Sequence, residues 1–313
     1  ALQALCGLAK DIYKWRGSVL PCKLVEGPWV VPMLHPSYIL RDYSIHPCAI
    51  SDLQKAQTIV QIGYTPPTYH VQLSPTIADI KDYIAQCKAN RGFTYDIETF
   101  GSRVRCLSLA YNGYSAIVIP FKRGFANYWS AKDEETVWAL LRGLFQAPGI
   151  YKCAQNWQFD LSLLTPLVGF PTPKLFDTMY AHHLICPELP HDLDFLASMH
   201  SDLNFYAIDS RKHGDLDTWI YCANDAMATY QVWRWAAIEL ERLGLWDFYT
   251  GYTMPLTRCL FEMQHRGVLI DQDVLGTAIN DTLAMADAKQ QELEALVGSP
   301  INVKYSKQVK ELF

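Results

Sequence analysis

Residues 92–98 read Gly92-Phe93-Thr94-Tyr95-Asp96-Ile97-Glu98, a pattern typical of a β-strand. The sequence around this strand alternates between strand-like and helix-like segments. We expect a hairpin of strands 104–111 and 115–121 with a tight turn at Asn112-Gly113, a helix over 133–146 and a strand over 150–154. This alternation predicts an α/β fold for the middle of the chain.

The composition is that of a folded chain with slight net acidity. Of 313 residues, 50% are apolar and 19% are charged, with 27 basic and 32 acidic residues giving a net charge of −5. The length alone would predict about two domains. A protein held to nucleic acid mainly by a basic surface would carry net positive charge. Any nucleic-acid binding is therefore expected to depend on local contacts, or on metal ions that offset an acidic pocket.

The nine cysteines are scattered and never form a Cys-x-x-Cys pair. This spacing argues against a disulfide scaffold or a zinc ribbon and favours a reducing, intracellular compartment such as the cytoplasm. No run of eighteen apolar residues is present, so no membrane partner is expected. The sequence lacks an initial methionine and ends within a helical pattern, which suggests a piece of a longer protein.

Two acids, Asp96 and Glu98, stand at positions i and i+2 of the expected strand and therefore on one face of it. Adjacent carboxylates repel each other unless a cation lies between them. Hard oxygen ligands of this kind favour magnesium or manganese. The alternative is a strand end with two solvated acids.

Two further acids belong to helix-like segments. Asn156 and Asp160 would lie one turn apart on one helix face, although Asn156 could be only an N-cap and Asp160 a solvated first-turn acid. Tyr221 and Asp225 have the same spacing inside an expected helix over 216–240. Residues expected to be buried flank Asp225, and an unpaired carboxylate there would be costly. The alternative is an acid on the polar face of an ordinary helix.

Taken together, the three blocks resemble the exonuclease motifs of the DEDD superfamily, in its tyrosine subtype. The blocks are Asp96-x-Glu98, Asn156-x-x-x-Asp160 and Tyr221-x-x-x-Asp225, and the segments 176–179 and 191–197 also resemble that family. The resemblance covers residues 68–240. It implies a ribonuclease H-like exonuclease domain with a mixed central sheet flanked by helices.

This resemblance implies phosphodiester hydrolysis with two divalent ions, Mg²⁺ or Mn²⁺. Asp96, Glu98 and Asp225 would hold the first ion, and Asp96 and Asp160 would hold the second. Tyr221 would orient the attacking water, because an unperturbed tyrosine is a poor base at pH 7. These four acids and Tyr221 are the expected catalytic residues.

The same resemblance implies three substrate contacts. Thr99, Asn156 and Phe159 stand where the family contacts the terminal nucleotides. Phe159 could stack against a base, a contact that tolerates any sequence. The alternative for Phe159 is an ordinary core position on the apolar helix face.

The C-terminal part, residues 241–313, is expected to be helical. Residues 254–271 resemble the segment that joins the exonuclease to the thumb in family A DNA polymerases, and a helix over 271–297 would be about 40 Å long. The resemblance implies a truncated thumb, with the palm and fingers in a longer parent chain and no polymerase activity from this chain. A generic helical hairpin is the alternative.

The N-terminal part, residues 1–67, resembles the C-terminal part of uracil-DNA glycosylases, which implies a partial α/β segment. Trp15-Arg16-Gly17 and His35-Pro36-Ser37 carry the match, together with Arg41. In that family the histidine lies at the glycosidic bond and the arginine lies near DNA, so His35 and Arg41 are candidate remnants of such a site. We favour a remnant that only packs against its neighbour, because half a pocket cannot hold a flipped base.

The leading hypothesis is a metal-dependent 3′-5′ exonuclease that acts on single-stranded DNA 3′ ends or primer-template DNA. It would be the proofreading part of a family A DNA polymerase in a bacterial cell or a virus-infected host cell. Three alternatives stay open: an RNA-trimming exonuclease, a non-catalytic clamp or assembly module of a replication protein, and a glycosylase.

Overall fold

The computed structural model describes residues 1–8, 11–171, 174–206 and 214–310. The chain divides into two units, Ala1–Phe261 and Glu262–Phe313, which are described separately. The expected division into residues 1–67, 68–240 and 241–313 stays a prediction.

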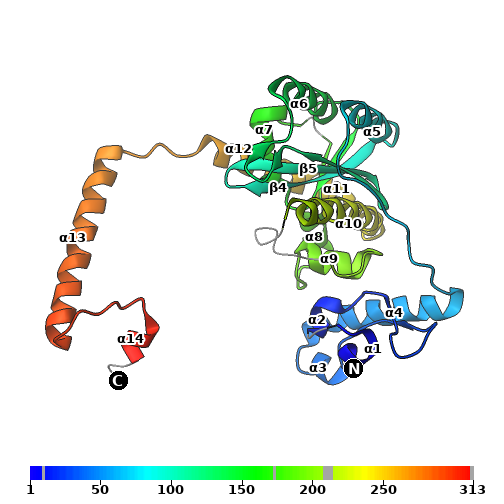
Figure 1. Cartoon of the computed structure of the whole chain (residues 1–313), viewed down its shortest axis with the longest axis horizontal. Coiled ribbons are helices and arrows are strands. Elements are labelled where there is room, and N and C mark those ends of the chain that lie inside the picture. The colour runs from blue at the N-terminus through cyan, green and yellow to red at the C-terminus, as the bar shows by residue number, and fades with distance from the viewer. Residues whose placement is uncertain (9–10, 172–173, 207–213, 311–313) are drawn as a thin grey trace. The chain divides into compact units, whose positions relative to one another are not determined.

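A six-stranded mixed sheet forms the centre of the larger unit (Figure 1), which confirms the predicted α/β class. Strands β4, β5 and β6 pair antiparallel, whereas β9 and β10 continue the sheet in parallel on one side and β3 does so on the other. In spatial order the strands are β10 (Leu175–Asp177), β9 (Tyr151–Ala154), β4 (Gly92–Phe100), β5 (Arg103–Asn112), β6 (Ser115–Pro120) and β3 (His70–Gln72).

Helices cover both faces of this sheet (Figure 1). One face carries α5 (Ile77–Ala89), α6 (Ala131–Phe145) and α7 (Trp157–Val168), and the other carries α8 (Thr178–Ile185), α9 (Leu193–His200) and α10 (Asp215–Arg242).

Strand alternation decides which side chains meet which helices. On β5, Leu107 belongs to the larger hydrophobic core, while Cys106 and Ala110 pack in a second core with residues of α10. Asp96 pairs with Ser108, whose hydroxyl donates to the backbone oxygen of Cys222 in α10 at 2.7 Å. The acidic face of β4 is therefore the face that α10 covers.

Helix caps explain where the observed helices begin. Helix α6 starts at Ala131 rather than at the expected residue 133, because Ser130 accepts a hydrogen bond from the backbone N–H of Asp133 at 3.2 Å. Helix α13 (Gln272–Val297) starts one residue later than expected, because Asp271 is its N-cap. Gly298 ends α13 in the left-handed conformation, with φ of 76°.

The described residues of the N-terminal segment 1–67 are mainly helical and pack on the part of the larger unit that contains the six-stranded sheet. Arg16 forms a buried ion pair with Asp52, with Nη2 2.8 Å from Oδ1, and its Nη1 donates to Ser198 of α9 at 2.7 Å. The elements of this segment are α1 (Leu2–Cys6), α2 (Ile12–Trp15), the hairpin of β1 (Leu20–Pro21) and β2 (Trp29–Val30), α3 (Pro36–Ile39), the 3₁₀ helix η1 (Tyr43–Ile45) and α4 (His46–Ile62).

Helices dominate the chain after α10. These are α11 (Trp246–Phe248), the π-helical turn η3 (Tyr249–Thr253), α12 (Met254–Arg266), α13 and α14 (Ser306–Lys310). Helix α13 buries none of its residues. Among the described residues, none of the helices combines the length and the apolar character that a bilayer crossing requires.

Candidate active site

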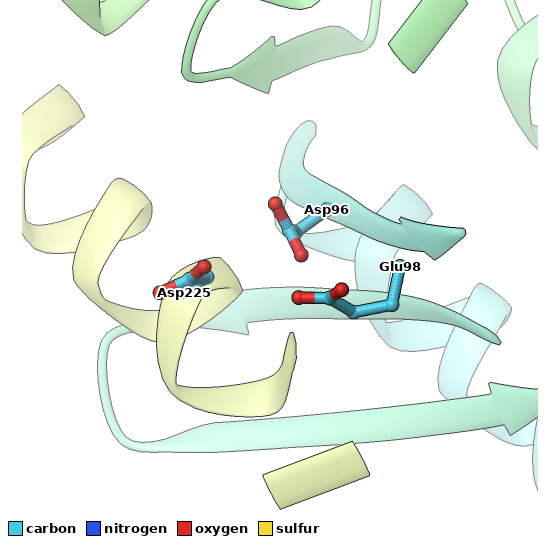
Figure 2. Close-up of side chains that lie close together, drawn as sticks. All are labelled: Asp96, Glu98 and Asp225. Atoms are coloured by element: carbon cyan, nitrogen blue, oxygen red, sulfur yellow. The ribbon is translucent and has the colours of Figure 1, made fainter. Parts of the chain in front are cut away.

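Three acidic side chains converge between β4 and α10. Ligand atoms of Asp96, Glu98 and Asp225 all lie within 4.8 Å of one another. Figure 2 shows the Asp96 and Glu98 carboxylates, from the strand, pointing toward the space next to Asp225 on the helix. The i, i+2 spacing on the strand is thus confirmed, and the tertiary fold adds the third acid.

These carboxylates are held in an environment that disfavours their charge. Asp225 is only 6% exposed, which excludes the alternative of an acid on a polar helix face. Burial raises the pKa of Asp96 well above the usual aspartate range, and the Cys222 thiol and the neighbouring carboxylates act in the same direction. Burial also raises the pKa of Asp225. A bound cation would remove this penalty, because it favours the ionised form of every acid around it.

The donor set fits a hard divalent cation. All three groups offer carboxylate oxygens, the ligands that magnesium and manganese prefer. The Oδ2 atom of Asp96 is buried and has no hydrogen-bond partner among the described residues. Buried polar atoms are rarely left unsatisfied, and a cation in contact with this oxygen would satisfy it.

Asp160, the fourth expected acid, lies next to this group but outside the set that meets within 4.8 Å. It is 4% exposed in the first turn of α7, so it is no solvated acid. Its Oδ1 accepts a hydrogen bond at 3.2 Å from the backbone N–H of Ile97, the residue between Asp96 and Glu98. Burial raises the pKa of Asp160, and the carboxylates of Asp177 and Asp225 act in the same direction.

The expected helical position of Asn156 is wrong. Helix α7 begins at Trp157, and Asn156 stands at its N-cap position, as in the alternative expectation. Its backbone is left-handed, with φ of 57°, and its side chain makes no capping hydrogen bond. The physical reason lies in Asp177, whose buried carboxylate accepts from the Trp157 N–H at 2.8 Å and also caps α8 through Met179. Asp177 thus fixes the turn before α7. The sequence contained Asp177 within a family-like segment but gave no signal of this contact.

The other two expected substrate contacts are accessible. Phe159 is 55% exposed on α7, which excludes the alternative of an ordinary core phenylalanine. Thr99 is partly buried on β4, one residue beyond Glu98, where the register shifts against β5.

Two tyrosines approach Asp225. Tyr221, one turn before it on α10, is partly buried, and burial together with the Asp225 charge raises its pKa above the usual tyrosine value. Tyr206 was not expected from the sequence, yet its hydroxyl donates to Oδ1 of Asp225 at 2.8 Å. Tyr206 belongs to no periodic segment with Asp225, so only the tertiary fold reveals it.

His35 and Arg41 belong to the N-terminal segment and are not members of the acid group. Both are exposed, and His35 Nδ1 accepts from the backbone N–H of Ser37 at 3.1 Å, which caps α3. Arg41 lies over the ring of Tyr38 at 5.8 Å.

Comparisons with known proteins give consistent matches. The model of a DNA polymerase A type family described as 3′-5′ exonuclease matches residues 71–236. DNA polymerase I of Borreliella burgdorferi is 22% identical over 228 residues, which are 70% of this chain and 25% of that protein. DNA polymerase I of Pseudomonas aeruginosa is 24% identical over 234 residues, with 69% and 25% covered. The chain thus spans about a quarter of the length of these relatives.

A solved structure shows the same fold. The POL domain of Pol1 from M. smegmatis, in complex with DNA primer-template and dNTP, is 16% identical and has a TM-score of 0.53. The match covers 77% of this chain and 40% of that chain.

Proposed function

Because the chain belongs to the DNA polymerase A type 3′-5′ exonuclease family, we propose that it removes nucleoside monophosphates from DNA 3′ ends. The family match and the mixed sheet together confirm the predicted ribonuclease H-like exonuclease fold. The observation that carries the proposal is the convergence of Asp96, Glu98 and Asp225 around the unsatisfied Oδ2 of Asp96.

In this proposal the acids hold two divalent cations, Mg²⁺ or Mn²⁺. Asp96, Glu98 and Asp225 would hold one, and Asp96 with Asp160 would hold the other. When bound, such a pair supplies a nucleophilic water at neutral pH and neutralises charge on the phosphate and the leaving 3′-oxygen.

The chain's other residues would position the substrate and the water. Tyr221 orients the attacking water through its hydroxyl and stays protonated, since its pKa is raised. Phe159, exposed and directly before Asp160 in the sequence, would contact a terminal base, and Thr99 and Asn156 would be further substrate contacts.

We further propose the tyrosine subtype and a polymerase context. Relatives named DNA polymerase I support DNA as the substrate and a proofreading role. In this proposal residues 1–67 are the glycosylase-like remnant, residues 68–240 the exonuclease and residues 241–313 the start of a thumb, with palm and fingers in a longer parent chain. The nine free cysteines support an intracellular reducing compartment, in a bacterial or virus-infected cell.

The test is digestion of 5′-labelled single-stranded DNA with Mg²⁺ or Mn²⁺, beside an RNA strand of the same sequence. We expect a ladder of products shortened from the 3′ end, faster on DNA, and none with EDTA. Asp96→Ala with Glu98→Ala should abolish the ladder while the thermal unfolding transition remains. Faster digestion of RNA would favour the RNA-trimming alternative. DNA binding without metal-dependent digestion, in a folded protein, would contradict the proposal and favour a clamp.

A further inference from the structure

Two phenylalanines are exposed side by side at the end of β4. Phe100, the last residue of that strand, is 52% exposed, and Phe125 is 89% exposed. Phe125 lies in the turn of a small hairpin formed by β7 (Lys122–Arg123) and β8 (Ala126–Asn127). The two ring centroids are 5.4 Å apart, with the planes nearly perpendicular at 84°. Their exposed surfaces are available to a ligand.

This aromatic pair adjoins the acid group. The register of β4 against β5 shifts between Glu98 and Thr99, where Arg105 is the extra residue on β5, so the alternation along β4 itself continues through the shift. Asp96, Glu98 and Phe100 therefore point to the same side of the strand. Phe100 lies two residues beyond Glu98, a step of about 7 Å along β4.

Basic residues belong to the strands next to the pair. Arg103 is exposed and pairs with Phe100 across the strands, while Lys122 and Arg123 form one strand of the Phe125 hairpin. One acid beside this hairpin is Asp215. It accepts hydrogen bonds from Arg105 Nη2 at 2.8 Å and from the Gly124 N–H at 2.7 Å. Arg103, Lys122 and Arg123 thus belong to the strands next to the pair, on a chain whose net charge is −5.

We propose that Phe100 and Phe125 form a stacking platform for bases of a single nucleic-acid strand whose 3′ end enters the acid group. The inference rests on the proposed function, and it names a substrate contact outside the three expected motifs. Aromatic faces stack on any base, and neighbouring basic side chains attract the phosphates. Together these two contacts bind single strands without sequence preference. Inside a duplex the base faces are stacked on one another and are not open to these rings.

The matched control is a second exposed aromatic pair. Phe248, on α11, is 48% exposed and stacks on Tyr252 with centroids 5.1 Å apart. The Phe125 hairpin contacts Asp215 at the start of α10, whereas α11 follows the end of that helix. At 1.5 Å per residue, the 28 residues of α10 make a helix of about 40 Å, and the two pairs lie near its opposite ends.

The experiment measures binding of a fluorescein-labelled single-stranded DNA by anisotropy, in EDTA and in an Asp96→Ala background that prevents digestion. We expect Phe125→Ala to weaken binding about ten-fold and Phe125→Trp to bind as the parent does. Phe125→Leu, which keeps an apolar side chain but lacks a ring, should behave as the alanine variant. Phe248→Ala should bind as the parent does.

A strand with abasic sites in place of bases provides the matching control on the ligand. Phe125→Ala should change its affinity by less than two-fold, because no base is left to stack. Unchanged binding of normal DNA by Phe125→Ala, or an equal loss with Phe248→Ala, would overturn the platform. The digestion assay is separate and uses the protein that keeps Asp96. Loss of binding with Phe125→Ala, together with no digestion by the protein that keeps Asp96, would support the platform and reject the nuclease.

Discussion

The hydroxyl of Tyr206 donates a hydrogen bond to Oδ1 of Asp225 at 2.8 Å. The backbone just before Tyr206 is held by the N-terminal segment: the Phe205 N–H donates to the Ser18 hydroxyl at 3.0 Å, and the Val19 N–H donates to the Asn204 side chain at 2.7 Å. Residues 1–67 therefore support the segment that orients a proposed metal ligand. This contact gives the N-terminal segment a structural role that requires no glycosylase activity.

We predict that Tyr206→Phe weakens Mn²⁺ binding about ten-fold, because hydrogen bonds to a ligating carboxylate fix its orientation. Electron paramagnetic resonance of free Mn²⁺ measures the affinity without digestion. Tyr114→Phe is the matched control, since the Tyr114 hydroxyl donates to the exposed Asp202 at 2.6 Å, outside the acid group. Equal Mn²⁺ affinity in the two variants, with unchanged thermal unfolding, would contradict a positioning role for Tyr206.

We predict that Asp96→Asn abolishes digestion but stabilises the metal-free protein by about 1 kcal/mol or more at pH 7. Burial and neighbouring acids raise the pKa of Asp96, so its ionised form destabilises the fold in the absence of a cation. Urea unfolding in EDTA measures the difference. Asp247→Asn, at an exposed acid on α11, should change stability by less than about 0.5 kcal/mol. A less stable Asp96→Asn protein would argue against repulsion at the site.

Local patterns in the sequence predicted the parts of this site that depend on one element. The period of two placed Asp96 and Glu98 on one strand face, and the period of 3.6 placed Tyr221 and Asp225 on one helix. The backbone conformation of Asn156 could not be predicted from its neighbours. The turn before α7 is held by a hydrogen bond from the Trp157 N–H to Asp177, which is distant in the sequence.

The contacts that the sequence did not predict join separate elements. Tyr206 meets Asp225, and Phe100 meets Phe125, only after the strands and helices have packed. A hydroxyl or an exposed ring carries no periodic signal of such a partner. The spacing of the motif residues within one element could therefore be predicted, whereas their contacts with other elements could not.

We predict that Arg16→Ala destabilises the chain by about 3–5 kcal/mol, because it leaves Asp52 buried without its partner. Replacing both groups, Arg16→Met with Asp52→Leu, should recover most of this loss, since no charge is then left buried. Urea unfolding measures both variants. Lys14→Ala is the control, because Lys14 and Asp11 form an exposed pair at 3.9 Å and should contribute less than about 0.5 kcal/mol. Equal effects of Arg16→Ala and Lys14→Ala would contradict a buried, integral N-terminal segment.

We predict that His182 contributes a loss of stability as the pH is lowered from 6.5 toward 4. The buried acids Asp96, Asp160 and Asp225, whose pKa values are raised, contribute in the opposite direction. Burial lowers the pKa of His182 to about 4, with help from His191, whose Nδ1 lies 2.7 Å from Nδ1 of His182. Between pH 6.5 and 4 the unfolded chain, with a histidine pKa of about 6.5, therefore binds a proton at this position that the folded chain does not bind. His182→Gln should reduce the slope of unfolding free energy by about 1 kcal/mol per pH unit between pH 6 and 5, measured by urea titration. The control is His70→Gln, at an exposed histidine, and equal slopes in the parent, the His182→Gln variant and this control would contradict the role of His182.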